Sequence, residues 1–130
     1  MKTLVVEDDF TSRLLLQEIL KRYGDVHIAV NGTEAIEAVK VSLESMEPYN
    51  LICLDIMMPE MDGQQALEKI RKLEEDMKIT ADKWSKIIMT TALSDFSNIK
   101  TAFGSLCDAY LIKPIDVAKL KKTIEEAGLI

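Results

Sequence analysis

The stretch Leu51-Ile52-Cys53-Leu54-Asp55 places four apolar residues in a row and ends on a carboxylate. A run without alternation between polar and apolar residues is typical of a strand that is covered on both faces, as in a parallel sheet. Similar runs occur at residues 4–6, 87–89 and 110–112, and a weaker candidate occurs at 26–30. These five segments predict a parallel five-stranded sheet with helices on both sides.

Between these runs, the apolar residues change to the period of an amphipathic helix. Strand and helix alternate five times, which predicts right-handed βαβ crossovers and a three-layer α/β sandwich. A shorter fourth helix is expected between Phe96 and Phe103, and the long segment 74–85 is expected to be an insertion held by Trp84. The four clearest apolar stripes are Leu15, Leu16, Ile19 and Leu20; Ile36, Val39, Leu43 and Met46; Ala66, Leu67, Ile70 and Leu73; and Val117, Leu120, Ile124 and Ala127.

The composition predicts one globular domain that spans residues 1–130. Hydrophobic residues make up 48% of the chain and charged residues 29%, a balance that excludes a disordered protein. The net charge of −6 disfavours nonspecific nucleic-acid binding, and no apolar run approaches the roughly 20 residues that a membrane span needs. No leader segment is recognised and two cysteines cannot build a disulfide framework, so we expect a cytoplasmic protein. The last predicted helix ends near Ala127-Gly128, so we expect no output domain in this chain.

Polar side chains follow the predicted strands at the point where each strand ends. Glu7 and Asp8 follow the first run, Asp55 ends the run at 51–55, and Thr91 and Lys113 follow the last two. Because ligands of an open parallel sheet bind outside the carboxyl ends of its strands, we expect these groups to share one crevice. A single Asp at a strand end is more often a turn residue or a helix cap. The interpretation therefore depends on all of these strand ends carrying complementary groups.

Each of these residue types has a chemical use in such a crevice. Adjacent carboxylates repel one another unless a cation or proton lies between them, and Mg²⁺ binds a few carboxylates, waters and phosphate oxygens. A carboxylate is also a nucleophile toward phosphorus, which would convert Asp55 to an aspartyl-phosphate. Lys113 and Thr91 would then bind the phosphate oxygens. Asp9 is ambiguous, because an Asp after the acidic pair can equally begin the first helix.

Five segments, in order, resemble the receiver domain of bacterial two-component response regulators, including the stand-alone receivers of chemotaxis. The resemblance covers nearly the whole chain, from Lys2 to about Leu129, and implies a flavodoxin-like (βα)5 fold with strand order 2-1-3-4-5. The segments are LVVEDD at 4–9, NGTEA at 31–35, LDIMMPEMDG at 54–63, MTTA at 89–92 and DAYLIKP at 108–114.

The resemblance implies a role for each residue of the crevice. Asp55 would accept a phosphoryl group from a phosphohistidine of a sensor histidine kinase. Lys113 would bind a phosphate oxygen, and its peptide bond to Pro114 is expected to be cis. The implied magnesium ligands are Asp8, Asp55 and the backbone carbonyl of Met57, with Glu7 acting through a metal-bound water. The implied phosphate-binding residues are Thr91, Ala92, Lys113 and Met57, and the implied switch residues are Thr91 and Tyr110.

The same resemblance implies that the chain is a signalling switch and not a metabolic enzyme. Phosphorylation would shift the population toward an active arrangement, in which Thr91 moves toward the phosphate and Tyr110 rotates inward. The surface formed by the fourth helix, fifth strand and fifth helix would carry the signal to a downstream protein target. Transfer of the phosphate to a histidine phosphotransfer protein is the alternative, and the sequence does not separate the two.

Two other classes of protein fit these residues less well. An aspartate-nucleophile phosphatase usually carries Asp-x-Asp after the strand, whereas this chain has Asp55-Ile56-Met57 and supplies no acid or base there. A flavin- or nucleotide-binding module would need a loop that cradles phosphates. Neither Gly-x-Gly-x-x-Gly nor a Walker lysine motif occurs in the chain.

Met57 and Leu93 depart from the more familiar polar residues of the family. They stand two positions beyond the expected phosphoacceptor and two beyond the switch threonine, where side chains flank the path of the hydrolytic water. Bulky apolar groups obstruct that water or fail to orient it. We therefore expect a long-lived phosphoryl group on Asp55.

Overall fold

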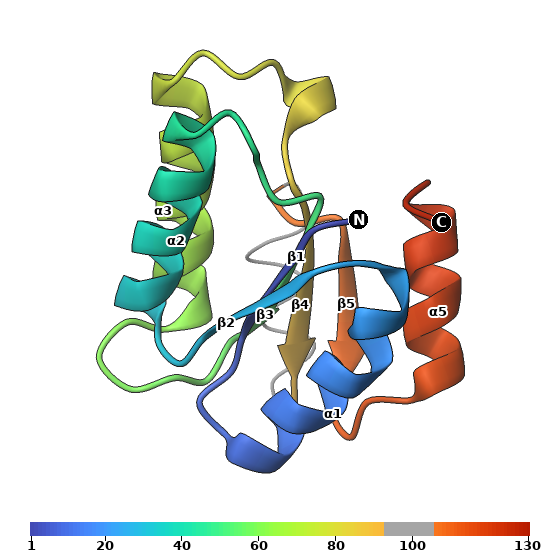
Figure 1. Cartoon of the computed structure of the whole chain (residues 1–130). Helices are drawn as coiled ribbons and strands as arrows, with labels where there is room; N and C mark the ends of the chain where they lie inside the picture. The colour runs from blue at the N-terminus through green and yellow to red at the C-terminus, as the bar shows by residue number, and fades with distance from the viewer. Residues whose placement is uncertain (93–105) are drawn as a thin grey trace.

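The computed structural model describes residues 1–92 and 106–130, which form one sheet between two layers of helices (Figure 1). All strand pairs are parallel, and the order is β2-β1-β3-β4-β5. The strands are β1 (Thr3–Val6), β2 (Val26–Ala29), β3 (Leu51–Asp55), β4 (Lys86–Thr91) and β5 (Ala109–Ile112). The helices are α1 (Phe10–Leu20), α2 (Gly32–Glu44), α3 (Gly63–Asp76) and α5 (Val117–Glu126), with short 3₁₀ turns η1 (Lys21–Tyr23) and η2 (Ala81–Lys83). The predicted flavodoxin-like order is confirmed, and the helix expected at 96–103 lies outside the described residues.

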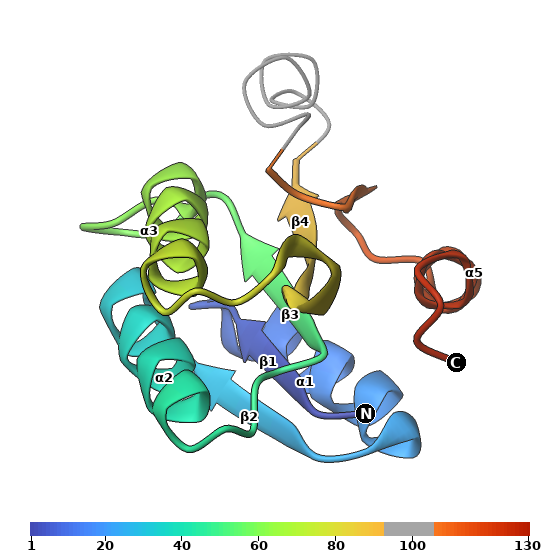
Figure 2. The same cartoon turned by 90° about the horizontal axis from the view of Figure 1, so that it is seen from above.

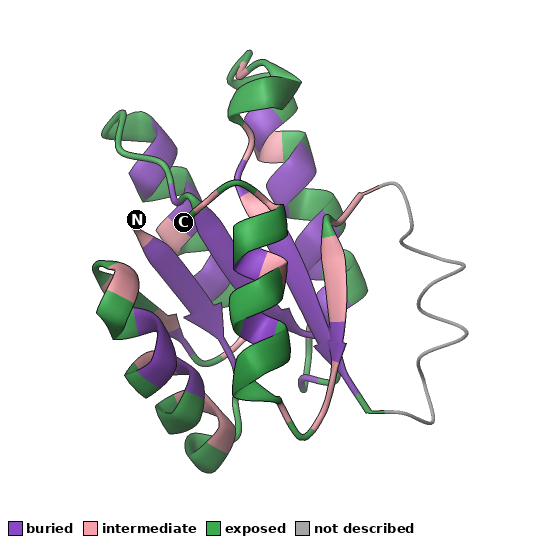
Figure 3. Ribbon diagram, turned by 90° about the vertical axis from the view of Figure 1, so that its right-hand side faces the viewer, coloured by how far each residue is buried: buried purple, intermediate pink, exposed green. Residues whose placement is uncertain are grey.

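Successive side chains of each strand point into two separate cores. Along β3, Ile52 and Leu54 pack against α2 and α3, whereas Leu51 and Cys53 pack against α1 and α5. Figure 2 shows these two pairs of helices on opposite faces of the sheet. Because both faces are covered, every residue of β3 is buried (Figure 3). Each buried Leu or Ile contributes about 1.5–3 kcal/mol, which explains why the strands lack polar alternation.

Each described α-helix begins at a side-chain oxygen that accepts a hydrogen bond from the backbone. Asp9 begins α1 by accepting the N–H of Ser12 at 2.9 Å. Asn31, Asp62 and Asp116 act in the same way at the starts of α2, α3 and α5. Such a cap satisfies an otherwise unpaired amide and contributes about 1 kcal/mol. The structure therefore assigns Asp9 to the start of a helix.

The predicted apolar stripes are right at their centres and wrong at three ends. Leu15 is 41% exposed, Met46 is 87% exposed and Val117 is 48% exposed. Met46 lies beyond the end of α2 and has a left-handed backbone (φ 60°), which removes it from the helix face. Leu15 lies about 100° around α1 from the buried Leu16, because an α-helix has about 3.6 residues per turn.

The segment 74–85 is only partly an insertion, because α3 continues to Asp76 and η2 follows at 81–83. Trp84 holds this segment, as predicted. Its Nε1 donates to the Ile79 carbonyl at 2.9 Å, and the Arg71 guanidinium lies 5.2 Å from its ring centroid. Among the helices of residues 1–92 and 106–130, none is long and apolar enough to cross a membrane.

Candidate functional site

The carboxyl ends of β1, β3 and β5 bring the predicted residues together. Glu7 directly follows β1, Asp55 is the last residue of β3, and Lys113 directly follows β5. The parallel register aligns the ends of neighbouring strands, at the edge toward which the arrowheads of β4 and β5 point in Figure 1. Glu7 and Lys113, which are 106 positions apart in the sequence, are therefore hydrogen-bonded.

One lysine amine joins two buried carboxylates. Lys113 Nζ lies 2.8 Å from Glu7 Oε1 and 3.2 Å from Asp55 Oδ1. The side chains of Glu7 and Asp55 are 1% and 4% exposed, whereas that of Lys113 is 27% exposed and faces solvent. Asp8 is exposed, and its carboxylate completes a group in which oxygens of Glu7, Asp8 and Asp55 lie within 4.8 Å of one another. In the described part of the chain, Lys113 therefore pairs with two of these three carboxylates.

The pKa of Glu7 reflects this shortage of positive charge. Burial and the neighbouring Asp55 raise the pKa of Glu7 to about 7, although Lys113 acts in the opposite direction. Burial lowers the pKa of Lys113, but its bond to Glu7 and the charge of Asp55 outweigh burial and raise it. Glu7 Oε2 is buried, and no described residue donates a hydrogen bond to it. A hard divalent cation with oxygen ligands would supply both the charge and the partner, so the residues fit Mg²⁺.

Two of the groups expected to bind phosphate, the Met57 N–H and Lys113 Nζ, contact Asp55. The Met57 N–H donates to Asp55 Oδ1 at 3.2 Å, while the Met57 side chain is 64% exposed. Thr91 is buried, and its Oγ1 donates to the Ala92 carbonyl at 3.2 Å. The Lys113 N–H donates to the Thr91 carbonyl at 2.7 Å and joins the end of β4 to the end of β5. The backbone therefore holds the threonine and the lysine side by side.

Tyr110 lies on β5, three residues before Lys113, and its ring packs against the core on the α2 and α3 side. Burial and the neighbouring Cys107 thiol raise the pKa of Tyr110. At the end of the same strand, the Lys113–Pro114 peptide bond is cis, which confirms the prediction made from the motif. Leu93, the other residue expected to affect hydrolysis, lies outside the described residues.

Two residues near the site were not predicted. Arg13 Nη1 donates to the Glu7 carbonyl at 3.2 Å, so α1 is tied to the acidic pair. Gly63 lies so close to β3 that a Cβ there would be 2.6 Å from the Asp55 carbonyl oxygen. The only sequence signal for Arg13 is its place one turn after the Asp9 cap. Gly63 belongs to a quoted motif, but nothing in the motif indicates the close approach.

Mg²⁺ binding is expected to strengthen as the pH rises through about 7. A cation stabilises the ionised form of Glu7, whose pKa is about 7, so binding below that pH must release a proton. Below that pKa, the apparent dissociation constant should fall by up to about tenfold for each unit by which the pH rises. Isothermal titration calorimetry in two buffers of different protonation enthalpy measures both the affinity and the proton release.

Glu7→Gln is the matched control, because the amide keeps the size of the side chain and does not ionise. Its Mg²⁺ affinity should be lower and should no longer change with pH near 7; an unchanged pH dependence would assign the proton to another group. The stability of the metal-free protein changes with pH in the opposite direction to Mg²⁺ affinity. Because the pKa of Glu7 is raised from 4.5 to about 7, its contribution to stability is present below 4.5 and is lost as the pH rises through about 7.

Known proteins are similar to this chain over nearly its whole length. Residues 3–125 match the response regulator receiver domain family. Over 128 residues the chain is 35% identical to the osmosensing histidine protein kinase SLN1 of Saccharomyces cerevisiae, a match that covers 97% of this chain and 10% of that kinase. The chain spans about half the length, or less, of the curated relatives that it matches.

Two solved structures share the fold over nearly the whole chain. The receiver domain of the histidine kinase CKI1 from Arabidopsis thaliana, complexed with Mg²⁺ and BeF₃⁻, gives a TM-score of 0.77 at 28% identity, covering 98% of this chain and 89% of that one. The receiver domain of Ssk1 from Saccharomyces cerevisiae, in complex with the phosphotransfer protein Ypd1, gives 0.80 at 27% identity and covers 98% and 88%. Because the family match extends over residues 3–125 and the fold is that of these receivers, the chain belongs to the response regulator receiver domain family of two-component systems.

Proposed function

We propose that Asp55 accepts a phosphoryl group from a phosphohistidine of a sensor histidine kinase, and that the phosphorylated form binds its partner differently. The observation that carries this proposal is the position of Lys113 Nζ, 2.8 Å from Glu7 and 3.2 Å from Asp55. An amine held between a metal-binding cluster and the acceptor carboxylate is within reach of a phosphoryl oxygen on Asp55. The role is that of a signalling phosphoacceptor and not of a metabolic enzyme.

The reaction is a transfer between two nucleophiles. An Asp55 carboxylate oxygen attacks phosphorus, the P–N bond to the donor imidazole breaks, and the imidazole keeps the electron pair. The Lys113 ammonium neutralises one phosphoryl oxygen. The remaining oxygens take hydrogen bonds from the Thr91 hydroxyl and from the backbone N–H groups of Met57 and Ala92. Positioning and charge, more than proton transfer, accelerate such a step.

We assign the metal site to Asp8, Asp55 and the Met57 carbonyl, with Glu7 acting through a metal-bound water. Bound Mg²⁺ would neutralise the carboxylates and the phosphoryl oxygens during transfer. Two observations support this assignment: the three carboxylates lie within 4.8 Å of one another, and no described residue donates to the buried Glu7 Oε2. The CKI1 receiver was solved with Mg²⁺ and BeF₃⁻, which also favours it.

Incubation with acetyl phosphate and Mg²⁺ tests the proposal. Intact-protein mass spectrometry should show the gain of one phosphoryl group, because the small acyl phosphate can replace the kinase as donor. Hydroxylamine, which cleaves acyl phosphates, should remove the group, and chelation of Mg²⁺ by EDTA should prevent its gain. A protein that stays unmodified with Mg²⁺ present contradicts the proposal, as does a modification that resists hydroxylamine.

The signal would pass from Thr91 to Tyr110 and then to a partner. The Thr91 hydroxyl now donates to the Ala92 carbonyl, so its turn toward a phosphate would break that bond and open space for the tyrosine. The partner surface would comprise β5, α5 and the helix expected at 96–103. On α5 this surface is partly apolar and carries charges of both signs. The exposed residues include Val117, Lys119, Lys121, Lys122, Glu125 and Glu126.

Relay of the phosphate to a histidine phosphotransfer protein is the second candidate, and an apolar surface beside the site favours it. Phe10 is 66% exposed and Leu14 is 45% exposed, one turn apart on α1. The Ssk1 receiver was solved in complex with the phosphotransfer protein Ypd1. Incubating phosphorylated protein with a phosphotransfer protein separates the roles: label that moves to histidine supports relay, and a stable complex that retains the label supports a binding target.

We place the protein in the cytoplasm and expect no nucleic-acid partner. Cys53 and Cys107 form no disulfide with each other, which suits a reducing compartment. The net charge of −6 opposes the approach of a polyanion.

The phosphorylated form should decay slowly. The Met57 side chain stands 64% exposed two residues beyond Asp55, where it offers a water no hydrogen bond. Replacing Met57 with Asn together with Leu93 with Glu should shorten the half-life of the phosphorylated protein at least about tenfold. Phos-tag electrophoresis after removal of acetyl phosphate measures the decay. Met57→Leu is the apolar control and should decay as the wild type does; an unchanged half-life in the polar double variant would show that other groups limit hydrolysis.

A further inference from the structure

A second charged cluster lies at the opposite edge of the sheet, where β4 and β5 begin. Its centre is Arg71 on α3, which is 7% exposed. Arg71 Nη1 donates to Glu74 Oε1 at 2.7 Å and to the Ser85 carbonyl at 2.9 Å. Arg71 Nε donates to the Leu106 carbonyl at 2.8 Å, and Nη2 donates to Asp108 Oδ2 at 3.2 Å. One guanidinium therefore joins the end of α3 to the residues that precede β4 and β5.

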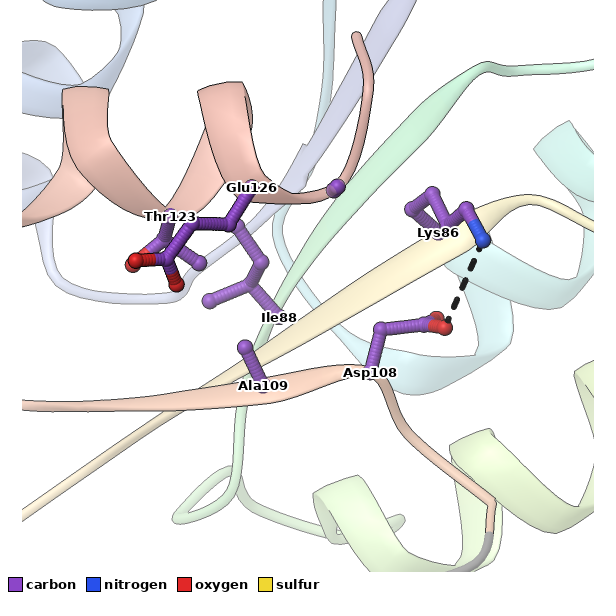
Figure 4. Close-up of a pocket in the computed structure, with 7 residues that line it drawn as sticks. Lys86, Ile88, Asp108, Ala109, Thr123 and Glu126 are labelled. Carbon is purple, nitrogen blue, oxygen red and sulfur yellow. Dashed lines mark ion pairs between the residues drawn. The ribbon is translucent and has the colours of Figure 1, made fainter.

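Other groups besides Arg71 also bind the two carboxylates of this cluster. Glu74 is 1% exposed, and its Oε2 accepts the Ser85 N–H at 2.8 Å. Asp108 Oδ2 accepts the Ile87 N–H at 2.8 Å, and its Oδ1 lies 3.9 Å from Lys86 Nζ. Figure 4 shows this last pair beside a cavity of about 340 Å³ between β4, β5 and α5. The cluster thus ties β4 and β5 to each other as well as to α3.

Stability alone does not account for such an arrangement. Taking two charges out of water offsets most of their attraction, so an apolar pair at 71 and 74 would hold the fold about as well. An apolar pair would lack the directional hydrogen bonds that orient neighbouring segments. Two of the four hydrogen bonds that Arg71 donates hold Leu106 and Asp108, which lead into β5, and the other two hold Glu74 and Ser85.

That segment contains a neighbour of the proposed switch tyrosine. Arg71 holds Leu106 and Asp108, the residues on either side of Cys107. The Cys107 side chain lies beside the Tyr110 hydroxyl, and both residues pack against the core that α3 helps to form. The position of Cys107 therefore decides the space that is open to the tyrosine side chain.

We propose that Arg71 is a positioning residue for the switch. Through Leu106 and Asp108 it holds Cys107 against Tyr110, and so sets the resting balance between the two positions of the tyrosine ring. This inference rests on the proposed role of Tyr110 in signalling. In this structure the ring packs against the core and its hydroxyl is buried, so without the hydrogen bonds from Arg71 the population shifts away from this position. Substitutions that act through such couplings change populations by about 2- to 30-fold.

Fluorine NMR of protein labelled with 3-fluorotyrosine tests the inference. The chain contains Tyr23, Tyr49 and Tyr110, and Tyr110→Phe assigns the resonance of interest. Arg71→Met combined with Glu74→Leu removes both buried charges, so no unpaired charge is left in the core. In this unphosphorylated variant, the Tyr110 resonance should move away from its position in the unphosphorylated wild type. The Tyr23 resonance should stay, and the rate of phosphorylation by acetyl phosphate should change at least about threefold.

The exposed ion pair of Lys72 and Asp76 is the matched control on the same helix. Its atoms are 3.0 Å apart and its side chains are 69% and 56% exposed. Lys72→Met with Asp76→Leu should leave the Tyr110 resonance in place. Arg71→Lys keeps the charge without the planar fork of donors and should give an intermediate shift, which a loss of charge alone would not produce.

A lower melting temperature with an unmoved Tyr110 resonance would make the role of Arg71 structural only and would overturn the inference. Asp108→Ala keeps the pair of Arg71 and Glu74 and gives a second route if the double variant does not fold. It should move the resonance in the same direction, and an unmoved resonance again overturns the inference. A wild type that does not respond to beryllofluoride, alongside a shift in these variants, would instead count against the proposed function of the site.

Discussion

Replacing Asp55 with Asn should abolish the acceptance of a phosphoryl group from acetyl phosphate. The amide keeps the size of the carboxylate but is not a nucleophile toward phosphorus. The change also removes one of the three carboxylates that lie within 4.8 Å of one another, so Mg²⁺ should bind more weakly. We expect the rate of phosphorylation to fall at least about 100-fold, measured as the loss of the shifted band on Phos-tag gels.

Asp62→Asn is the control in the same loop. Asp62 begins α3 by accepting the Gln65 N–H at 3.0 Å, and Asn is an equally good residue at that position, so phosphorylation should be unchanged. The melting temperature of Asp55→Asn should stay level or rise, because one of three crowded carboxylates is gone. A variant that remains folded and still forms the shifted band would place the acceptor elsewhere.

Replacing Gly63 with Ala should destabilise the fold and slow phosphorylation together. A Cβ at this position would lie 2.6 Å from the Asp55 carbonyl oxygen and 2.7 Å from the Ile56 Cα. Both are backbone atoms that cannot rotate away, so the end of β3 must shift, and the acceptor carboxylate shifts with it. We expect a loss of about 1–3 kcal/mol in the free energy of unfolding, measured by urea denaturation.

Gly32→Ala provides the comparison. The three atoms nearest to a Cβ at Gly32 all belong to the Met61 side chain. A change of rotamer moves Sδ and Cγ, at 2.7 and 2.8 Å, whereas Met61 Cβ at 2.9 Å requires a small shift of the loop. This variant should lose less stability and should accept phosphate at the wild-type rate. Equal effects of the two substitutions would show that the approach of Gly63 to β3 does not set the position of Asp55.

The sequence predicts the site well because the site consists of strand ends. Apolar runs locate the strands, and parallel strands place their carboxyl ends at one edge. Glu7, Asp55 and Lys113 could therefore be brought together from their positions alone, and the contacts of Lys113 confirm that they meet. The raised pKa of Glu7 was not accessible in this way, because it depends on how completely the fold buries the side chain.

The Arg71 cluster could not be predicted from the sequence. Arg71 stands among Lys69, Lys72 and Glu75, and the sequence pattern predicts that all charged residues of this helix are exposed to solvent. Its burial arises from partners 14 to 37 positions away, at Ser85, Leu106 and Asp108. A pattern of polar and apolar residues carries no information about such distant partners. The same lack of information explains why Met46 was wrongly placed on the apolar stripe. Its exposure depends on its left-handed backbone and not on its spacing in the sequence.

The strand order has a consequence for how the protein is made. In the order β2-β1-β3-β4-β5, every strand after β1 pairs with a strand that precedes it in the chain. A polypeptide that leaves the ribosome from its N-terminus can therefore build the sheet outward, one strand at a time, onto an edge that already exists. Lys113 follows the last strand to be added. The nascent chain thus acquires its acidic pocket first and the cation that balances it last.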